Sequence, residues 1–487
     1  METSKKKNLA RTTVLGTLWT YAAHYSGKLM VFVSTIILAR LLLQEDFGVA
    51  GYALVVINFL DVLNDLGIGS ALIYYPEERE TSDTAFWLGF AVSLTLLAAC
   101  WLMAPLVGDF FNDPRAVPVV RVLALTFPLS AFGNVHRMLL LKGLAFRRKF
   151  IPDVSKALSK GLISIALAAS GFGAWSLIWG QIGGTLIAVI ALWWVLPWRP
   201  RFHFAPDKAR LLLSYGLNIV AVNIVAVLIL NVDYLFIGRA LGAGPLGIYT
   251  LAFRIPELVI MQFCNVITRV MFPVYAKMRS ESQSLSRGFL TITRYISLIT
   301  IPLGLGMALV AEPFVLTVFT EKWLDAIPVM RAISIYALFT SLYYSAGDIY
   351  KVQGQPSVLT KLGILNLIIL VPALWGSTFV SGSIVAIAWT QAAVTFFMMG
   401  IRLFVACRML DTPFKMVLSA LQAGAVGGAI MSLAVSGILL ISPSLPPLAQ
   451  LILAVLVGGS AYVAALWWLQ RDVVMMASQT LRSAFNV

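Results

Sequence analysis

The stretch LARLL at residues 38–42, followed by FG at 47–48, closes the first apolar run of this chain. The stretch IGRAL at residues 237–241, followed by LG at 246–247, closes the seventh. Four residues return 199 positions later: Arg40, Leu42, Gly48 and Ala53 return as Arg239, Leu241, Gly247 and Ala252. Leucine and alanine matches arise easily between apolar segments, whereas an arginine and a glycine at matched spacing do not. We interpret the match as an internal repeat.

A second match extends the repeat toward the C-terminus. Trp179-Gly180-Gln181 corresponds to Trp389-Thr390-Gln391, at an offset of 210 residues. Because six apolar runs separate the two copies, both copies cross the membrane in the same direction, as in a parallel repeat. We therefore predict an N-terminal lobe of spans 1–6 at 1–200, a second lobe of spans 7–12 at 201–410, and two additional C-terminal helices at 411–487. Such lobes enclose a cleft near the bilayer midplane that opens alternately to each side.

The composition is that of an integral membrane protein. Of 487 residues, 59% are hydrophobic and 12% are charged, and the mean hydropathy is +0.87. A soluble domain carries about 25% charged residues, so this chain cannot coat a water-facing surface. Since a span needs about 20 apolar residues, we predict an all-α fold with fourteen transmembrane helices. The stretches are 14–42, 48–73, 85–108, 117–141, 151–170, 174–196, 212–238, 246–271, 287–311, 325–350, 357–379, 383–406, 414–441 and 448–470. Residues 312–325 are a candidate for a short re-entrant turn.

The distribution of positive charge orients the fourteen spans. With the N-terminus inside, 27 of the 36 lysines and arginines fall on tails and inner connectors, and six fall on outer ones. Three remain at membrane depth: Lys28, Arg137 and Arg254. This bias follows the positive-inside rule and predicts that both termini are cytoplasmic. The net charge of +14 is spread over short connectors, which indicates membrane lipid headgroups and not nucleic acid as the partner.

No catalytic or metal-binding pattern is visible. Cys100, Cys264 and Cys407 lie singly in apolar runs, as buried hydrophobic residues do. The three histidines are scattered, and no phosphate-binding glycine-rich loop occurs. We expect no enzyme activity, no cofactor and no metal.

Span 1 carries four polar or ionisable residues on one helical face: Tyr21, His24, Tyr25 and Lys28. Ionisable groups inside spans are costly and usually face a cavity or each other. One interpretation is a cationic, aromatic wall that binds phosphate and stacks on sugar. The other is that Lys28 pairs with Asp61 of span 2 and holds the two helices together.

Span 2 carries Asn58, Asp61 and Asp65 on one face, with Asn64 beside them. The two carboxylates are candidates for binding a coupling cation or proton. They are equally candidates for structural counter-ions near a kink at Gly67–Gly69, and this is the interpretation that we favour.

Spans 4 and 7 add further candidates. Arg137, next to His136 near the inner end of span 4, either extends to the headgroups or captures an anionic group at the cytoplasmic mouth. Asp233 of span 7 is a possible counter-ion or ion-coupling residue.

Span 8 carries a polar stripe. Arg254, Gln262, Asn265 and Arg269 fall along one face, and Glu257 lies three residues after Arg254, where the two can pair. The stripe predicts either a cavity lining, which we favour, or hydrogen bonding between helices.

The segments 38–42, 45–48 and 65–73, together with 239–249 in the second copy, carry a family resemblance. They resemble the Wzx-type polysaccharide-transport flippases of the MOP superfamily, in the colanic-acid-like branch. The span count and the two added C-terminal helices fit this family as well.

The resemblance implies a substrate and a location. The cargo would be an undecaprenyl-pyrophosphate-linked oligosaccharide repeat unit, translocated across the bacterial inner membrane for polysaccharide biosynthesis. A polysaccharide polymerase or export complex would be a partner. The resemblance also implies a cationic cavity, although the residues named above are our own interpretation.

Three alternatives remain. A lipid-II-type flippase has the same span count and related chemistry. A multidrug or cation exporter of the same superfamily typically has twelve spans and cavity carboxylates, which the basic residues at membrane depth disfavour. A polymerase or ligase needs a large outer loop, which the sequence does not provide.

Overall fold

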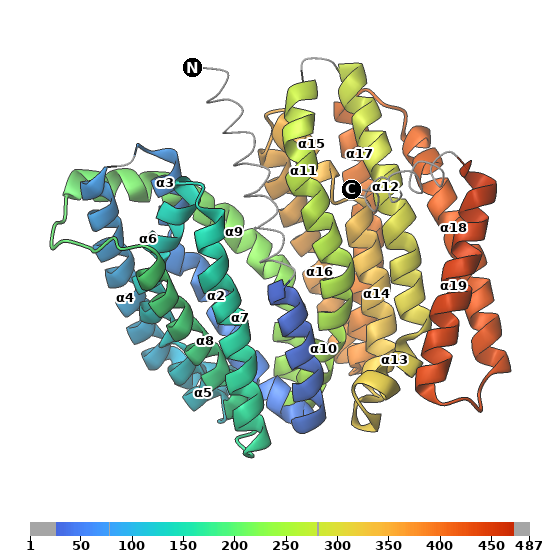
Figure 1. The fold of residues 1–487 in the computed structure, drawn as a ribbon, viewed down its shortest axis with the longest axis horizontal. Coiled ribbons are helices and arrows are strands. Elements are labelled where there is room, and N and C mark those ends of the chain that lie inside the picture. The colour runs from blue at the N-terminus through green and yellow to red at the C-terminus, as the bar shows by residue number, and fades with distance from the viewer. Residues whose placement is uncertain (1–25, 77, 280–281, 472–487) are drawn as a thin grey trace. The chain divides into compact units, whose positions relative to one another are not determined.

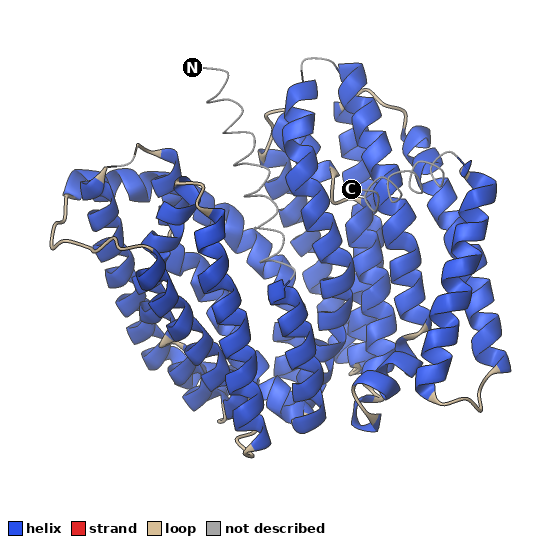
Figure 2. Ribbon diagram, viewed as in Figure 1, coloured by secondary structure: helices blue, strands red, loops and turns tan. Residues whose placement is uncertain are grey.

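The computed structural model describes residues 26–76, 78–279 and 282–471, and every regular element in these ranges is a helix (Figure 2). Twelve helices within the described ranges are long and apolar enough to cross a membrane. The predicted all-α, multi-span membrane fold is therefore confirmed. Tyr21, His24 and Tyr25 lie outside the described residues.

The chain packs as two compact units, and unit 1 ends at Thr250. Its described part consists of a helix at 26–41, α2 (Gln44–Asp65), α3 (Ile68–Tyr74), α4 (Arg79–Phe111), α5 (Ala116–Leu123), α6 (Thr126–Lys142), α7 (Phe146–Ala169), α8 (Ala174–Val195), α9 (Pro206–Leu241) and the start of α10 (Ala243–Pro256) (Figure 1).

Unit 2 begins at Leu251. After the end of α10 come a π-helix (Glu257–Met261), α11 (Gln262–Met278), α12 (Ser282–Leu309), α13 (Ala311–Val318), a 3-10 turn (Glu321–Trp323), α14 (Ala326–Leu342), α15 (Ala346–Val352), α16 (Ser357–Ser381), α17 (Ile384–Met409), α18 (Phe414–Ile441) and α19 (Pro447–Leu469) (Figure 1). Helices α18 and α19 pack on each other, and α18 packs on α12. The short elements between α12 and α14 occupy the segment that we expected to turn.

Each of the fourteen predicted stretches contains helix, but two are not among the twelve membrane-length helices. Of the first stretch, only residues 26–41 are described. The other is α7, whose last 18 residues carry three charges, Asp153, Lys156 and Lys160. The count of fourteen stays a prediction.

Span 2 is broken where we predicted a kink. Helix α2 ends at Asp65 and α3 starts at Ile68, with φ angles of 44° at Leu66 and 66° at Gly67 between them. Glycine adopts this left-handed conformation without a steric penalty. It also allows close contact with α9, because a Cβ on Gly67 would lie 2.6 Å from the Gly216 Cα atom.

The first residues of matched helices are separated by the same offsets as the sequence repeat. Helices α2 and α10 start at Gln44 and Ala243, 199 residues apart. Helices α5 and α14, which open with the related stretches AVPVVR at 116–121 and AIPVMR at 326–331, start 210 residues apart, and so do α8 and α17. The two offsets are those of the sequence matches, so matched residues occupy matched places in the helices.

The repeated glycines meet at a reciprocal contact between α2 and α10. A Cβ on Gly48 would lie 1.8 Å from the carbonyl oxygen of Ala243, and a Cβ on Gly247 would lie 1.8 Å from that of Gln44. Because Ala243 and Gly247 are Gln44 and Gly48 displaced by 199 residues, each copy makes the same contact with the other, as in a two-fold interface. The sequence match thus marks a place where only glycine fits.

Candidate functional site

A polar cavity of about 230 Å³ lies inside unit 1, between α2, α6, α7 and α8. Its polar lining combines carboxylate, amide, hydroxyl and basic groups: Asp61, Asn64, Asp65, Ser130, Asn134, Arg137, Lys156 and Thr185. Its remaining lining is Gly133, Met138, Ala188, Val189 and Leu192. Three residues singled out from the sequence, Asp61, Asp65 and Arg137, are therefore brought together.

The acidic wall of the polar cavity is supplied by the last turns of α2. The Asn64 side chain is 3% exposed and accepts a hydrogen bond from Ser93 Oγ at 2.8 Å. It also hydrogen-bonds to the carboxylate of Asp61. The Asp65 carboxylate accepts from the backbone amides of Gly67 and Gly69, the latter at 3.4 Å. Asp65 is thus committed to the break between α2 and α3, while Asp61 faces the polar cavity with an exposed side chain.

The basic wall comes from α6 and α7. The charges of Lys156 and Arg137 both act on Asp61, and Asp153 also acts on Lys156. Asp61, Arg137 and Lys156 lie within the predicted spans 48–73, 117–141 and 151–170, and ionisable side chains inside spans usually pair or face a cavity. With Asp61, Asp65, Arg137 and Lys156 charged, the formal charge of the lining sums to zero.

Close packing of small residues fixes the walls. A Cβ on Gly184 of α8 would lie 2.8 Å from Lys160 Cβ and 3.0 Å from the Lys156 carbonyl oxygen. A Cβ on Gly133 of α6 would lie 2.9 Å from Leu192 Cδ1. Small residues let membrane helices approach in this way, and here they place Lys156 over the polar cavity. The α8 side contributes three apolar residues, Ala188, Val189 and Leu192, together with Thr185.

His136, the neighbour of Arg137, belongs to a different environment. Its side chain is fully buried, its Nε2 lies 3.1 Å from the Trp198 carbonyl oxygen, and its ring stacks on Trp193 at 5.0 Å. His136 packs the segment after α8 against α6 and does not line the polar cavity.

Lys28 lies on the helix at 26–41, which packs on α7. A Cβ on Gly27 would lie 3.8 Å from Ala157 Cβ, and one on Gly161 of α7 would lie 3.1 Å from Ser34 Cβ. Lys28 itself is half-buried. Its pairing with Asp61 stays a prediction.

Asp233 of α9 is a satisfied buried carboxylate. It is 1% exposed and accepts hydrogen bonds from the Tyr249 hydroxyl at 2.6 Å and from the Tyr234 amide at 3.0 Å. Buried carboxylates need such donors. The contact joins α9 to α10 within unit 1, and Asp233 does not line the polar cavity.

The span 8 stripe begins at an irregular helix. Arg254 Nη1 lies 3.7 Å from Glu257 Oε2, the pairing that the spacing predicts. Both side chains are more than a third exposed, and Glu257 starts the π-helix that follows Pro256. Such π-bulges occur often at functional sites. Farther along, Asn265 accepts a hydrogen bond from the Tyr344 hydroxyl, and Gln262 is 8% exposed. The side chain of Arg269 lies outside the described residues.

Four polar residues of the cavity lining were missed from the sequence: Ser130, Asn134, Lys156 and Thr185. Lys156 carried a usable signal, because it is a charged residue inside the predicted span 151–170. The three uncharged residues carry no such signal, because serine, threonine and asparagine are common within membrane helices.

Comparison with known proteins identifies the relatives. The Escherichia coli lipopolysaccharide biosynthesis protein WzxC is 27% identical over 370 residues, covering 75% of each chain. The Bacillus subtilis teichuronic acid biosynthesis protein TuaB is 26% identical and covers 80% of this chain and 81% of that protein. The Rhizobium meliloti succinoglycan biosynthesis transport protein ExoT is 26% identical over 67% of this chain and 66% of that protein.

Solved structures share the fold. The lipid II flippase MurJ in its inward closed conformation superposes with a TM-score of 0.76 at 13% identity, covering 95% of this chain and all of that one. An inward-facing multidrug resistance transporter of the MOP superfamily gives 0.65 at 15% identity, covering 79% and 94%. At these identities the likeness concerns the fold alone. The profile of the polysaccharide biosynthesis protein family matches residues 37–328, more than half of the chain, and the chain belongs to this family.

Proposed function

We propose that this protein is a flippase that translocates an undecaprenyl-pyrophosphate-linked oligosaccharide repeat unit across the bacterial inner membrane. The observation that carries the proposal is the family match over residues 37–328, in a chain that has charged groups at membrane depth. The relatives are named for the biosynthesis of three different polysaccharides, and one of them is named as a transport protein. A transporter of precursors that share one type of lipid carrier, and not an enzyme, explains one family serving several polymers.

The mechanism we propose is alternating access. The repeat defines two lobes, residues 1–200 and 201–410, with residues 411–487 as two additional helices and both termini in the cytoplasm. The lipid tail stays in the bilayer while the headgroup crosses between the lobes. A polymerase or export complex would receive the flipped repeat unit.

Basic residues at membrane depth would hold the diphosphate. Arginine and lysine are the natural partners of phosphate oxygens, and such contacts strengthen away from water. Arg254 is the best placed, because it is partly exposed on a π-bulged helix and its Glu257 partner lies 3.7 Å away. At that distance the pair is weak enough for a phosphate to displace the carboxylate. Lys28 and Arg269, together with the hydrogen-bonding groups of Gln262 and Asn265, complete our set, and His24, Tyr21 and Tyr25 would face the same path.

A lipid-II-type flippase is the second candidate, and the fold of MurJ favours it. Fold likeness at 13% identity does not specify a substrate, whereas the named relatives are polysaccharide proteins. We therefore retain the polysaccharide precursor as cargo.

The test is polymer export in a strain that depends on this gene. We expect Arg254→Ala and Lys28→Ala each to abolish export at normal protein level. The matched control is Arg408→Ala, which removes an exposed arginine at the end of α17 and should leave export intact. Normal export by both Arg254→Ala and Lys28→Ala would refute the cationic path.

A further inference from the structure

We propose that the polar cavity of unit 1 binds one uncharged sugar ring of the cargo, so that it recognises the saccharide and not the diphosphate. This inference rests on the proposed function and adds to it a specificity site.

The size of the polar cavity admits one ring. Its volume of about 230 Å³ lies below the roughly 300–1,000 Å³ of sites for drug-sized ligands. Since each water in the liquid occupies about 30 Å³, the cavity has the volume of a small cluster of waters. A single sugar ring displaces such a cluster.

The two walls of the polar cavity match the two aspects of a sugar. A pyranose presents hydroxyl groups at its edge and C–H bonds on its faces. The α2, α6 and α7 walls offer acceptors at Asp61 and donors at Arg137 and Lys156, with the Asn134 amide supplying both. The α8 wall offers Ala188, Val189 and Leu192 for the C–H face.

The charge of the polar cavity argues against the diphosphate as its ligand. Helix α2 contributes Asp61 and Asp65, α6 contributes Arg137, α7 contributes Lys156, and α8 contributes no charge. The sum is zero, and the two basic groups already act with Asp61. A diphosphate entering here would face two carboxylates, whereas hydroxyl groups bridge a carboxylate and a neighbouring cation without displacing either.

The experiment uses the purified full-length protein and a panel of lipids. The panel consists of bare undecaprenyl pyrophosphate and the same lipid carrying one glucose, one galactose or one N-acetylglucosamine. Binding is measured for the wild type and for Asn134→Leu and Thr185→Val, which alter the polar cavity without changing its charge. Thr95→Val is the matched control, since it makes the same substitution at an exposed position of α4.

We expect at least one sugar to tighten wild-type binding by about tenfold over the bare lipid. This gain should disappear in Asn134→Leu and Thr185→Val and persist in Thr95→Val, while all four proteins bind the bare lipid within about twofold. The inference is overturned if no sugar tightens binding, or if the gain in affinity survives in both cavity variants. It is also overturned if those variants lose as much affinity for the bare lipid as for the glycosylated lipids. If the wild type binds none of the lipids and flips none of them in vesicles, the proposed function itself fails.

Discussion

The polar cavity of unit 1 and the matching region of unit 2 show what the two copies of the repeat share and what they do not. Arg137 and Lys156 correspond, 210 residues later, to Gly347 and Asn366. In the repeat, the α2 carboxylates correspond to positions in the stretch 258–268 of span 8, which contains no charged residue. The same helical framework is thus built with and without the four charges.

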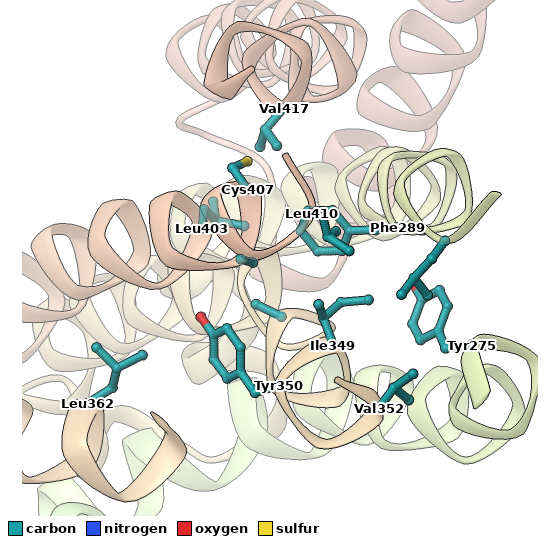
Figure 3. Packing of buried hydrophobic residues seen from close by; sticks show 13 residues of the cluster. Tyr275, Phe289, Ile349, Tyr350, Val352, Leu362, Leu403, Cys407, Leu410 and Val417 are labelled. Carbon is teal, nitrogen blue, oxygen red and sulfur yellow. The ribbon is translucent and has the colours of Figure 1, made fainter. Parts of the chain in front are cut away.

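Unit 2 contains a packed cluster of apolar and aromatic side chains. The cluster in Figure 3 includes Tyr275, Phe289, Ile349, Tyr350 and Cys407, all at most 2% exposed. Asp348 lies beside it, 2% exposed, with Lys351 Nζ 3.5 Å from one carboxylate oxygen. Because unit 2 builds the corresponding helices without these four charges, the charges of unit 1 are not a requirement of the fold and point to a role in binding.

The most severe test of this comparison places an acidic residue in unit 2 at a position that corresponds to the acidic wall of unit 1. Ile260 of the π-helix is fully buried. We expect Ile260→Asp to prevent accumulation of folded protein, because an unpaired buried carboxylate costs several kcal/mol against a total stability of about 5–15 kcal/mol. The measurement is size-exclusion chromatography of a fluorescent fusion, with Ile260→Val as the control. A monodisperse Ile260→Asp protein at wild-type level would show that unit 2 also tolerates charge.

The next largest effect concerns the pair in the polar cavity. We expect Asp61→Asn and Lys156→Met each to lower the melting temperature, and the double variant to lose less than the sum of the two. Residues coupled through a shared cavity interact by roughly 0.5–3 kcal/mol, and both side chains line the polar cavity. The control is a second double-mutant cycle, in which Asp65→Asn takes the place of Asp61→Asn beside Lys156→Met. Asp65 is chosen because its carboxylate is held by the amides of Gly67 and Gly69. Additive effects in the Asp61 cycle would show that the two charges do not act on each other.

The repeat contact between α2 and α10 provides a third, smaller effect. Gly48→Ala and Gly247→Ala each place a methyl group 1.8 Å from a backbone oxygen, so the helices must separate. Overpacking of this kind typically costs about 1–3 kcal/mol, and we expect a lower melting temperature for both variants. Gly244→Ala, whose nearest neighbour is Glu45 Cγ at 4.0 Å, should melt like the wild type. A difference between Gly48→Ala and Gly247→Ala would show that the contact is not symmetric.

The sequence locates twelve of the fourteen predicted spans and the two repeat offsets in the described residues, because both depend on properties that single residues carry. Hydropathy locates the helices, and Gly48 and Gly247 mark a close contact that no side chain allows. The related stretches at 116–121 and 326–331 were available in the sequence and would have strengthened the second offset.

The site was less predictable. Which side chains share a cavity depends on how each helix is rotated about its axis, and here packing at Gly133 and Gly184 decides it. Asp61 and Lys156 line one cavity for that reason, although their helices are far apart in the sequence. Conversely, the sequence made Asp233 a candidate counter-ion or ion-coupling residue, and its partner Tyr249 became visible only in the fold.

The smallest effect is expected at a connector where the two copies differ in the sign of a charge. Arg115, between α4 and α5, corresponds to Asp325 in the second copy. Its guanidinium donates to Asp113 Oδ2 at 2.9 Å and to Glu45 Oε2 at 2.8 Å, which joins this connector to the start of α2. Burial raises the pKa of Asp113, but the hydrogen bonds and charge of Arg115 outweigh it and hold the pKa below its ordinary value of 3.8.

A carboxyl group whose pKa is lowered in the folded protein stabilises the fold at pH values above its ordinary pKa. This stabilisation is lost as the pH falls through the lowered pKa of the folded protein. Arg115→Gln should therefore melt below the wild type at pH 7, by no more than the equivalent of about 1 kcal/mol for a partly exposed pair. The difference should shrink as the pH falls below 3.8. Arg121→Gln is the control, because Arg121 donates to the Trp101 carbonyl and lies over its ring, so its effect should not change with pH. A difference for Arg115→Gln that is constant with pH would mean that the residue acts through packing and not through the Asp113 carboxylate.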